Sequence, residues 1–478
     1  MNRKSILALG LICTSIAAAS SAEPDPAASA LARDVLKELI SINTTDSVGS
    51  VTRAAEAMRA RLHAAGFPDA DLHVLGPNER KKNLVVRLHG TGAHRPILLI
   101  GHLDVVEAPR LEWSTDPFEL TERDGYFYGR GVSDMKDGDA ILVTTLLRFK
   151  REGFKPDRDL IVALTADEEG GRSNGVEWLV KEHRDLIDAE WVINEDSESV
   201  YMRHDVPEEY QLGATEKLYA DYLLSTANPG GHSSLPVPQN AIYELTAGLA
   251  RLQQYRFPVE LNAVTRAYFE RMAPRQTGER AADMRAILRS PPDEAAAQRL
   301  SQDPLDNALL HTTCVATRLS AGQANNALPQ AATAIVNCRI LPGHSGEETR
   351  QELIRVLADP HIRVQYVADD GQVSDRGTDR KSMPATALVP EYLQPLEALV
   401  GQMWPGIPVI PTMSVGASDD IYTRAGGMPS YIITGIAINR DDIRDHARDE
   451  RLEVRSFYRG NEFIYRYLES ITSGARTP

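Results

Sequence analysis

Short apolar segments alternate with amphipathic segments over the first half of this chain, and this alternation constrains its fold more than any other feature. Four segments have the length and composition of buried strands, namely residues 83–88, 97–101, 160–164 and 189–194. Helical spacing of apolar residues predicts helices at residues 28–40, 139–153 and 175–183. The pattern predicts an α/β sheet with helices on its faces, in which ligands bind at the carboxyl ends of the strands.

A compact unit of different character interrupts this pattern after Thr215. Its predicted strands are residues 218–226, 314–319, 333–341 and 362–367, and its predicted helices are residues 239–254 and 346–358. Such a composition is typical of an α+β unit with an antiparallel sheet. The α/β pattern then resumes at residues 388–403, 409–413, 430–436 and 452–473. We therefore predict an α/β protein whose larger domain comprises residues 23–214 and 375–478, with a smaller domain inserted at residues 215–374.

Residues 1–22 have the pattern of a secretory signal peptide. Two basic residues precede an apolar run that ends in Ser20-Ser21-Ala22, a small-residue cleavage site. The run is too short to span a bilayer comfortably, because a membrane helix needs about 20 apolar residues. Cys13 lacks the small preceding residue of a lipoprotein signal. We expect cleavage near Ala22 and an exported product, periplasmic or secreted, without a lipid anchor.

Charge and cysteine content narrow the possible partners. The chain has a formal net charge of −15, and removal of residues 1–22 makes it more negative. Such a surface repels nucleic acid and anionic lipid, so we expect no nucleic-acid partner and no membrane association after signal cleavage. Cys314 and Cys338 lie on two neighbouring predicted strands. They are too few for a cysteine metal site, and both a disulfide and two reduced, buried thiols remain open.

Polar residues follow the predicted strands. His102 and Asp104 come directly after the strand at residues 97–101. Residues two apart on a strand point to the same side, so Asp104 can accept a hydrogen bond from one ring nitrogen of His102 while the other binds a metal. A histidine that merely caps the strand end is the alternative.

Asp134 is the second candidate, in a segment rich in glycine and other small residues. It could equally be a turn aspartate or the N-cap of the next helix. The spacing of the acids that follow excludes a calcium loop of the EF-hand type. The small residues around Asp134 indicate backbone packed closely against another group.

Glu168 and Glu169 are the third candidates, because they end the buried strand at residues 160–164. Adjacent residues on an extended backbone point in different directions, so one carboxylate can bind a metal while the other faces its water. Glu195 and Asp196 follow another strand, and His446 follows the last one. Together these side chains form an oxygen- and nitrogen-rich set suited to zinc or a similar divalent ion. Two ions that share a bridging carboxylate would lie about 3.5–4 Å apart.

Ser173 raises a different possibility, since residues 171–175 match the G-x-S-x-G pattern of a serine nucleophile elbow. An elbow nucleophile sits immediately after its strand, whereas Ser173 comes well beyond Leu164, and the chain has no oxyanion motif of the HGGG type. A serine hydrolase is therefore a remote alternative. A binding protein that kept the fold and lost the chemistry is another.

Five motifs together resemble the M20 metallopeptidase family, which includes glutamate carboxypeptidase, aminoacylase, acetylornithine deacetylase and succinyl-diaminopimelate desuccinylase. In family order they are Gly101-His102-Leu103-Asp104, Gly131-Val132-Ser133-Asp134-Met135-Lys136, Asp167-Glu168-Glu169-Gly170, Gly230-Gly231-His232-Ser233-Ser234-Leu235-Pro236 and His446-Ala447-Arg448-Asp449-Glu450. The resemblance extends from about Ala32 to Tyr467. It implies a zinc-peptidase-like catalytic domain with an inserted α+β lid that mediates dimerisation.

The resemblance also implies an activity and a set of roles. The expected reaction is metal-dependent hydrolysis of an amide or peptide bond next to a free carboxylate, as in a carboxypeptidase or dipeptidase, with an N-acyl-amino-acid deacylase as the alternative. The expected cofactor is two Zn²⁺ ions, with Co²⁺ or Mn²⁺ as alternatives. The implied roles are Asp134 as bridging ligand, His102 and Glu195 at one ion, Glu169 and His446 at the other, Glu168 as general base and Asp104 as the partner of His102.

In the lid, the resemblance makes His232 the residue that reaches the active site of a partner subunit and stabilises the oxyanion. It assigns the grip on the substrate carboxylate to Asn326 and Arg339, and a guanidinium suits that role because it binds a carboxylate through two parallel hydrogen bonds. The chain departs from the family pattern at one metal-ligand position and at two places that bear on the choice of substrate. Asp196 is an alternative to Glu195, residues 215–218 replace a Gly-Lys-Gly-like start of the lid, and residues 256–306 form a long, charged, mostly helical insertion.

Overall fold

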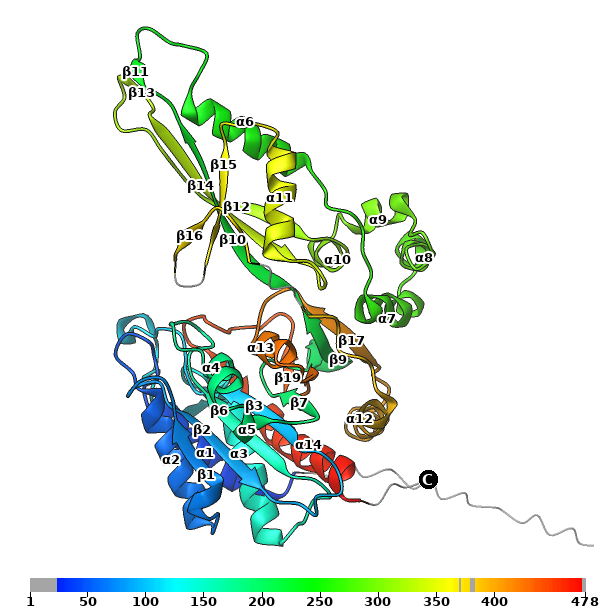
Figure 1. Ribbon diagram of the computed structural model, residues 1–478. Coiled ribbons are helices and arrows are strands. Elements are labelled where there is room, and N and C mark those ends of the chain that lie inside the picture. The colour runs from blue at the N-terminus through cyan, green and yellow to red at the C-terminus, as the bar shows by residue number, and fades with distance from the viewer. Residues whose placement is uncertain (1–23, 369–370, 379–382, 475–478) are drawn as a thin grey trace, which may run out of the picture.

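The computed structural model describes residues 24–368, 371–378 and 383–474, which form a larger domain and a smaller one joined by extended strands (Figure 1). The predicted signal peptide at residues 1–22 lies outside the described residues. Within them, every helix is too short or too polar to cross a bilayer. The mixed α/β fold predicted from the sequence is confirmed.

The larger domain is built on a ten-stranded mixed sheet with the order β1-β2-β6-β3-β7-β18-β9-β8-β19, and β17 pairs with β9. Its strands are β1 (Leu72–Leu75), β2 (Asn83–Leu88), β3 (Ile97–His102), β6 (Leu160–Thr165), β7 (Trp191–Asn194), β8 (Val200–Arg203), β9 (Val206–Glu216), β17 (Val409–Ser414), β18 (Ser430–Ile432) and β19 (Ala437–Asn439). β3 runs parallel to both β6 and β7. The carboxyl ends of these three strands therefore meet at one edge of the sheet.

Helices cover both faces of this sheet. One layer comprises α1 (Pro26–Ser41), α2 (Val51–Ala64), α3 (Lys136–Glu152) and α14 (Val454–Thr472), and the other comprises α4 (Gly175–Glu182), α5 (Arg184–Ile187) and α13 (Asp420–Ala425). The alternation of side chains along β3 explains this arrangement, since Ile97 and Leu99 pack into the first layer whereas Leu98 and Ile100 pack into the second. Strands buried on both faces read as continuous apolar runs.

Smaller elements complete the larger domain. A three-stranded sheet contains β4 (Thr121–Arg123), β5 (Tyr126–Tyr128) and β20 (Arg451–Glu453), with the order β20-β5-β4. Helix α12 (Pro390–Met403) packs on α14. α3 ends at Glu152 and is capped by Gly153, whose positive φ of 67° is typical of the residue that follows a helix C-terminus.

The smaller domain has a five-stranded antiparallel sheet with the order β12-β14-β10-β15-β16. Its elements are β10 (Leu218–Ala227), α6 (Ala241–Gln254), β12 (Thr313–Ala321), β14 (Ala331–Ile340), α11 (Gly346–Leu357), β15 (Arg363–Val367) and β16 (Val373–Ser374). At its far end β11 (Gly231–His232) pairs with β13 (Ala327–Leu328). Cys314 and Cys338 lie opposite each other on β12 and β14 and form a disulfide, which resolves the alternatives that the sequence left open.

The helical insertion contacts both domains. The mostly helical character predicted for residues 256–306 is confirmed by α7 (Ala263–Met272), α8 (Gly278–Ala286), α9 (Glu294–Leu300) and α10 (Pro304–Leu310). Its core includes Leu341 from the smaller domain and Ile410 and Met413 from β17 of the larger one. Arg271 on α7 also donates to the carbonyl of Val409. The insertion therefore packs at the junction of the domains (Figure 1).

Candidate metal centre

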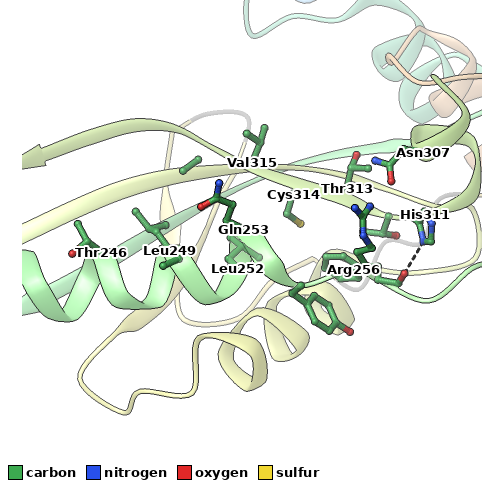
Figure 2. A pocket seen from close by; sticks show the side chains of 15 residues that line it. Thr246, Leu249, Leu252, Gln253, Arg256, Asn307, His311, Thr313, Cys314 and Val315 are labelled. Atoms are coloured by element: carbon green, nitrogen blue, oxygen red, sulfur yellow. Dashed lines mark hydrogen bonds between the residues drawn. The ribbon is translucent and has the colours of Figure 1, made fainter. Parts of the chain in front are cut away.

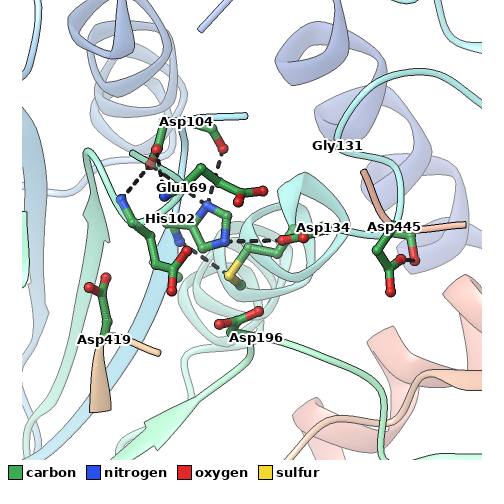
Figure 3. A network of polar contacts seen from close by, with 12 residues as sticks. His102, Asp104, Gly131, Asp134, Glu169, Asp196, Asp419 and Asp445 are labelled. Atoms are coloured by element: carbon green, nitrogen blue, oxygen red, sulfur yellow. Dashed lines mark hydrogen bonds and ion pairs between the residues drawn. The ribbon is translucent and has the colours of Figure 1, made fainter. Parts of the chain in front are cut away.

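The candidate metal-binding side chains converge at the carboxyl edge of the larger sheet. His102 is the last residue of β3, and Glu168 and Glu169 lie in the loop after β6. Asp196 follows β7, while Asp134 lies in the turn before α3. Figure 3 shows His102 pointing toward Asp134, with Glu169 and Asp196 close by. The topology explains why His102, Glu169 and Asp196 converge, because the parallel strands β3, β6 and β7 place their ends together.

The side chains form two groups that share one carboxylate. One group is His102, Asp134 and Asp196, and the other is Asp134, Glu169 and His446. Asp134 Oδ1 lies 3.2 Å from His102 Nε2, and Asp134 Oδ2 lies 3.0 Å from His446 Nε2. His446 Nε2 is also 2.9 Å from Glu169 Oε1. Each oxygen of Asp134 thus faces a different group, which is the geometry of a bridging ligand.

The structure places Asp196, the alternative to Glu195, in the first group. Glu195 is fully buried, and its carboxylate oxygens have no hydrogen-bond partner among the described residues. Its Cγ packs against Gly138 in α3, and its carboxylate belongs to neither group of ligand atoms. Successive residues of an extended segment point to opposite sides, and Asp196 is the one that points to the site. Burial raises the pKa of Glu195, as does the nearby Asp137.

Asp104 contacts His102 differently from the prediction. His102 Nδ1 lies 3.1 Å from the backbone carbonyl of Asp104 and 3.7 Å from its carboxylate, so the carbonyl is the hydrogen-bond acceptor. This contact leaves Nε2 free to face Asp134. The carboxylate of Asp104 instead accepts hydrogen bonds from the backbone N–H groups of Glu168, at 3.2 Å, and Glu169, at 3.0 Å. Asp104 therefore fixes both the histidine and the loop with the two glutamates.

A buried ion pair stabilises the loop that carries Glu168 and Glu169. Asp167, for which the sequence predicted no role, is buried, has a positive φ of 60° and pairs with the Lys81 ammonium. It also accepts a hydrogen bond from the backbone N–H of Ser173 at 3.1 Å. These contacts turn the chain sharply at Asp167, so that Glu168 and Glu169 are presented at the edge of the sheet.

The electrostatics of the site favour a bound cation. Burial raises the pKa of Glu168 well above its usual value, and the neighbouring carboxylates add to this effect. Burial likewise raises the pKa of Asp196 to about 8. Hydrogen bonds to Asp134 and Glu169 raise the pKa of His446 to about 10. Crowded carboxylates that resist ionisation are the expected state of a divalent-ion site without its positive charge.

Several residues of the site were missed from the sequence. Asp419 is buried at the same edge, where its carboxylate accepts hydrogen bonds from Asn174 and Thr165. Its position after the strand at residues 409–413 was an available signal. Arg130 and Glu450 form a buried ion pair next to Asp134. Glu450 belonged to a recognised motif, but its role depends on contacts that no spacing reveals.

The tip of the lid, which carries β11 and β13, lies far from this centre within one chain (Figure 1). His232 is exposed on β11 at the tip of the lid, where its Nδ1 lies 2.7 Å from Ser234 Oγ. Asn326 lies beside it, because the backbone carbonyl of Asn326 accepts a hydrogen bond from the Ser233 N–H at 3.1 Å. Arg339 is near the other end of β14, roughly 25–30 Å from the lid tip at the usual rise per strand residue. The Arg339 guanidinium stacks on the Tyr219 ring at 4.7 Å.

Ser173 has the surroundings of a structural residue. Its hydroxyl accepts a hydrogen bond from Asn78 Nδ2 at 3.1 Å. Within the described part of the chain, no histidine makes a hydrogen bond to this hydroxyl. Without a base to remove its proton, Ser173 cannot act as an elbow nucleophile. The serine-hydrolase alternative therefore has no support.

Comparisons with known proteins agree with the geometry. The chain has the two-domain fold and the clustered carboxylates and histidines of a metal-dependent hydrolase. It belongs to peptidase family M20/M25/M40, whose family model matches residues 98–470. It is therefore an enzyme, a metal-dependent peptidase or amidohydrolase of that family, as the sequence motifs predicted.

Individual relatives are distant but cover most of the chain. The mouse N-fatty-acyl-amino acid synthase/hydrolase PM20D1 is 24% identical over 390 residues, which span 79% of this chain and 74% of that protein. Among solved structures, the M20 family metallo-carboxypeptidase Sso-CP2 from Sulfolobus solfataricus matches with a TM-score of 0.66 at 15% identity, covering 92% of this chain and 99% of that one. Bacillus subtilis YXEP, described as a dinuclear metal-binding M20 peptidase, matches with a TM-score of 0.58 at 10% identity, covering 94% and 99%.

Proposed function

We propose that this enzyme hydrolyses an amide or peptide bond next to a free carboxylate, with two Zn²⁺ ions as its cofactor. The observation that carries the proposal is the shared carboxylate of Asp134, whose two oxygens face two different groups of ligand atoms. Histidine nitrogen and carboxylate oxygen are donors that zinc accepts, and Co²⁺ or Mn²⁺ would fit the same set.

Each group has a stated role in this proposal. His102, Asp134 and Asp196 hold one ion, and Asp134, Glu169 and His446 hold the other. The raised pKa of Asp196 supports the assignment, because a nearby divalent cation would stabilise its ionised form. When bound, the ions acidify a shared water and polarise the scissile carbonyl.

Glu168 acts as the general base. Its backbone is fixed by the hydrogen bond to Asp104, and its side chain is half-buried and faces other carboxylates, including that of Asp196. Glu168 accepts the proton of the attacking water at its carboxylate and returns it to the leaving nitrogen. A raised pKa suits both steps, since a base of intermediate strength can accept a proton and release it again.

Two observations support the substrate class: the substrates named for related proteins and the guanidinium of Arg339. PM20D1 is named as an N-fatty-acyl-amino acid synthase/hydrolase and Sso-CP2 as a carboxypeptidase. The substrates of both classes have a free carboxylate beside the scissile amide. Arg339 can bind that carboxylate through its guanidinium. Peptide hydrolysis is the leading activity and deacylation of N-acyl amino acids the second, because the metal centre serves either.

The lid supports a homodimer in which His232 and Asn326 act in the partner's site. β12 is an edge strand whose Val315 and Leu319 are 60% and 59% exposed. A groove of about 700 Å³ runs between this strand and α6 (Figure 2). An exposed edge with apolar side chains is a ready pairing surface. In the dimer, His232 would donate a hydrogen bond to the oxyanion and Asn326 would help to bind the substrate carboxylate.

The proposal extends to the compartment. The disulfide between Cys314 and Cys338 suits an oxidising environment, which supports export to the periplasm or beyond the cell. Fractionation of expressing cells, with mass measurement of the mature N-terminus, tests this point. The expected result is a secreted or periplasmic protein cleaved near Ala22; a cytoplasmic, uncleaved protein contradicts it.

The function is tested by a substrate screen on metal-loaded enzyme. Protein stripped with a chelator should be inactive, and about two equivalents of zinc per chain should restore hydrolysis of dipeptides or N-acyl amino acids. Amidation of the substrate's free carboxylate should abolish turnover, and the unmodified substrate is the matched control. Full activity in the stripped protein, or equal turnover of amidated substrates, contradicts the proposal.

A further inference from the structure

A buried carboxylate outside both ligand groups holds the backbone around Asp134. Glu450 has no exposed surface, and its carboxylate accepts hydrogen bonds from three backbone N–H groups of the turn that carries Asp134. The donors are the backbone N–H groups of Gly131 at 3.1 Å, Ser133 at 2.9 Å and Asp134 at 3.3 Å. One carboxylate therefore fixes the backbone on which the bridging ligand stands.

The partner of Glu450 reaches the other loop. Arg130 pairs with Glu450 through one terminal nitrogen and donates with the other to the carbonyls of His446, at 3.3 Å, and Ala447, at 3.1 Å. Its guanidinium also stacks over the Trp113 ring at 5.0 Å. Arg130 is buried, so this contact is shielded from water. The ion pair thus links the turn with Asp134 to the loop with His446.

We propose that Arg130 and Glu450 are positioning residues that fix Asp134 relative to His446. They thereby determine the affinity of the second metal site, the one formed by Asp134, Glu169 and His446. This inference rests on the proposed two-metal centre. Asp134 and His446 come from distant parts of the chain, and both are held by backbone contacts to the same ion pair. The planar guanidinium is suited to this task, because it donates in several fixed directions at once, whereas a lysine ammonium is a compact point charge.

A side-chain hydrogen bond also joins the turn with Asp134 to the loop with His446, and its effect must be distinguished from that of the ion pair. Ser133 Oγ lies 2.8 Å from Asp445 Oδ1 and 3.1 Å from Glu198 Oε1. Ser133→Ala removes this side-chain contact and leaves the Ser133 N–H available to Glu450. If the ion pair is the main positioning device, Ser133→Ala should alter metal affinity much less than changes at Arg130 or Glu450.

The experiment compares Glu450→Gln, Arg130→Lys and Ser133→Ala in the full chain. Glu462→Gln is the matched control, because Glu462 pairs with Arg148 between α14 and α3, in a largely buried ion pair away from the site. Zinc affinity is measured by competition with a chromogenic chelator, and the visible spectrum of cobalt-loaded protein reports the coordination geometry. Thermal unfolding of the metal-free protein measures any purely structural effect.

We expect Glu450→Gln and Arg130→Lys to weaken the second zinc equivalent by about 10–100-fold, as is usual when a residue that orients metal ligands is changed. The cobalt spectrum should change, and kcat should fall more than KM rises. Glu462→Gln should retain both zinc equivalents and the parental spectrum, even where its melting temperature falls.

Several outcomes overturn the inference. Folded Glu450→Gln and Arg130→Lys proteins with parental zinc affinity and parental cobalt spectra would show that the pair only stabilises the fold. If Glu450→Gln does not fold, Arg130→Lys decides the matter by the same readouts. Failure of both to fold, while Glu462→Gln folds, contradicts a role specific to the metal centre. A parent protein that binds fewer than two ions contradicts the proposed function instead.

Discussion

The edge of the large sheet and the tip of the lid differ in how completely one chain builds them. At the sheet edge, Asp134, Glu169 and Asp196 lie within a few ångströms of the two histidines, and buried contacts fix the loops that carry them. At the lid tip, His232 and Asn326 are exposed, and the tip lies far from these groups (Figure 1). Metal binding should therefore need only the larger domain, whereas turnover should need both regions.

The largest expected effect on turnover is at the sheet edge. Glu168→Gln removes the proposed base while keeping the size of the side chain and the backbone contact to Asp104. We expect kcat to fall by roughly 10²–10⁴-fold, the usual contribution of general acid–base catalysis. Steady-state kinetics and metal analysis check this together. A variant that keeps both ions and more than a tenth of the parental kcat contradicts the assignment.

A change at the lid tip should lower turnover without loss of metal. His232→Ala is expected to reduce kcat by roughly 10²-fold or more, as removal of an oxyanion donor does, with both zinc equivalents retained. Mixing unfolded His232→Ala and Glu168→Gln chains and refolding them together tests the contribution across subunits. Recovery of activity in the mixture supports it.

The outcome of that mixing experiment is informative in either direction. If the mixture remains as inactive as its components while dimers form, His232 does not act in the partner's site. If His232→Ala loses zinc, the separation between the two regions is wrong. Refolding each variant alone provides the control.

Asp196 and Glu195 offer a finer comparison within the sheet edge. Asp196→Asn should weaken one zinc equivalent, with a fall of about 10–100-fold in affinity or activity. Glu195→Gln should change zinc affinity little, because burial already favours the neutral form of that carboxyl group. Calorimetric zinc titration of both variants measures the difference. The reverse ranking would restore the original choice of Glu195 as ligand.

The smallest expected effect on the metal centre is that of the lid disulfide. Replacing Cys314 and Cys338 together by alanine should lower the free energy of unfolding of the lid by about 2–4 kcal/mol. Zinc affinity should be unchanged, because both cysteines belong to the lid sheet. Denaturant unfolding and zinc titration of the double variant check this. Loss of zinc from the folded double variant would mean that the two regions are coupled.

The sequence predicted much of the sheet edge because simple periodicities govern it. Apolar runs indicated β3, β6 and β7, and polar residues directly after each run indicated where ligands would gather. The choice between Glu195 and Asp196 stayed open in the sequence, because it depends on which side of a strand end each residue faces. That side changes with every residue, and family analogy did not determine it.

Other features were beyond reach because they depend on long-range contacts. The carboxylate of Asp104 binds backbone N–H groups of a loop about sixty residues away, and Arg130 binds backbone carbonyls still further along the chain. The helical character of residues 256–306 was evident from composition. Their packing against β17 at the domain junction was not, because it depends on how the two domains meet.

Anomalous X-ray scattering at the zinc edge, from crystals of zinc-loaded protein, tests the central claim most directly. The account predicts two peaks about 3.5–4 Å apart, with the carboxylate of Asp134 between them. His102 and Asp196 should flank one peak, and Glu169 and His446 the other. A single peak, or two peaks that Asp134 does not bridge, would contradict the account.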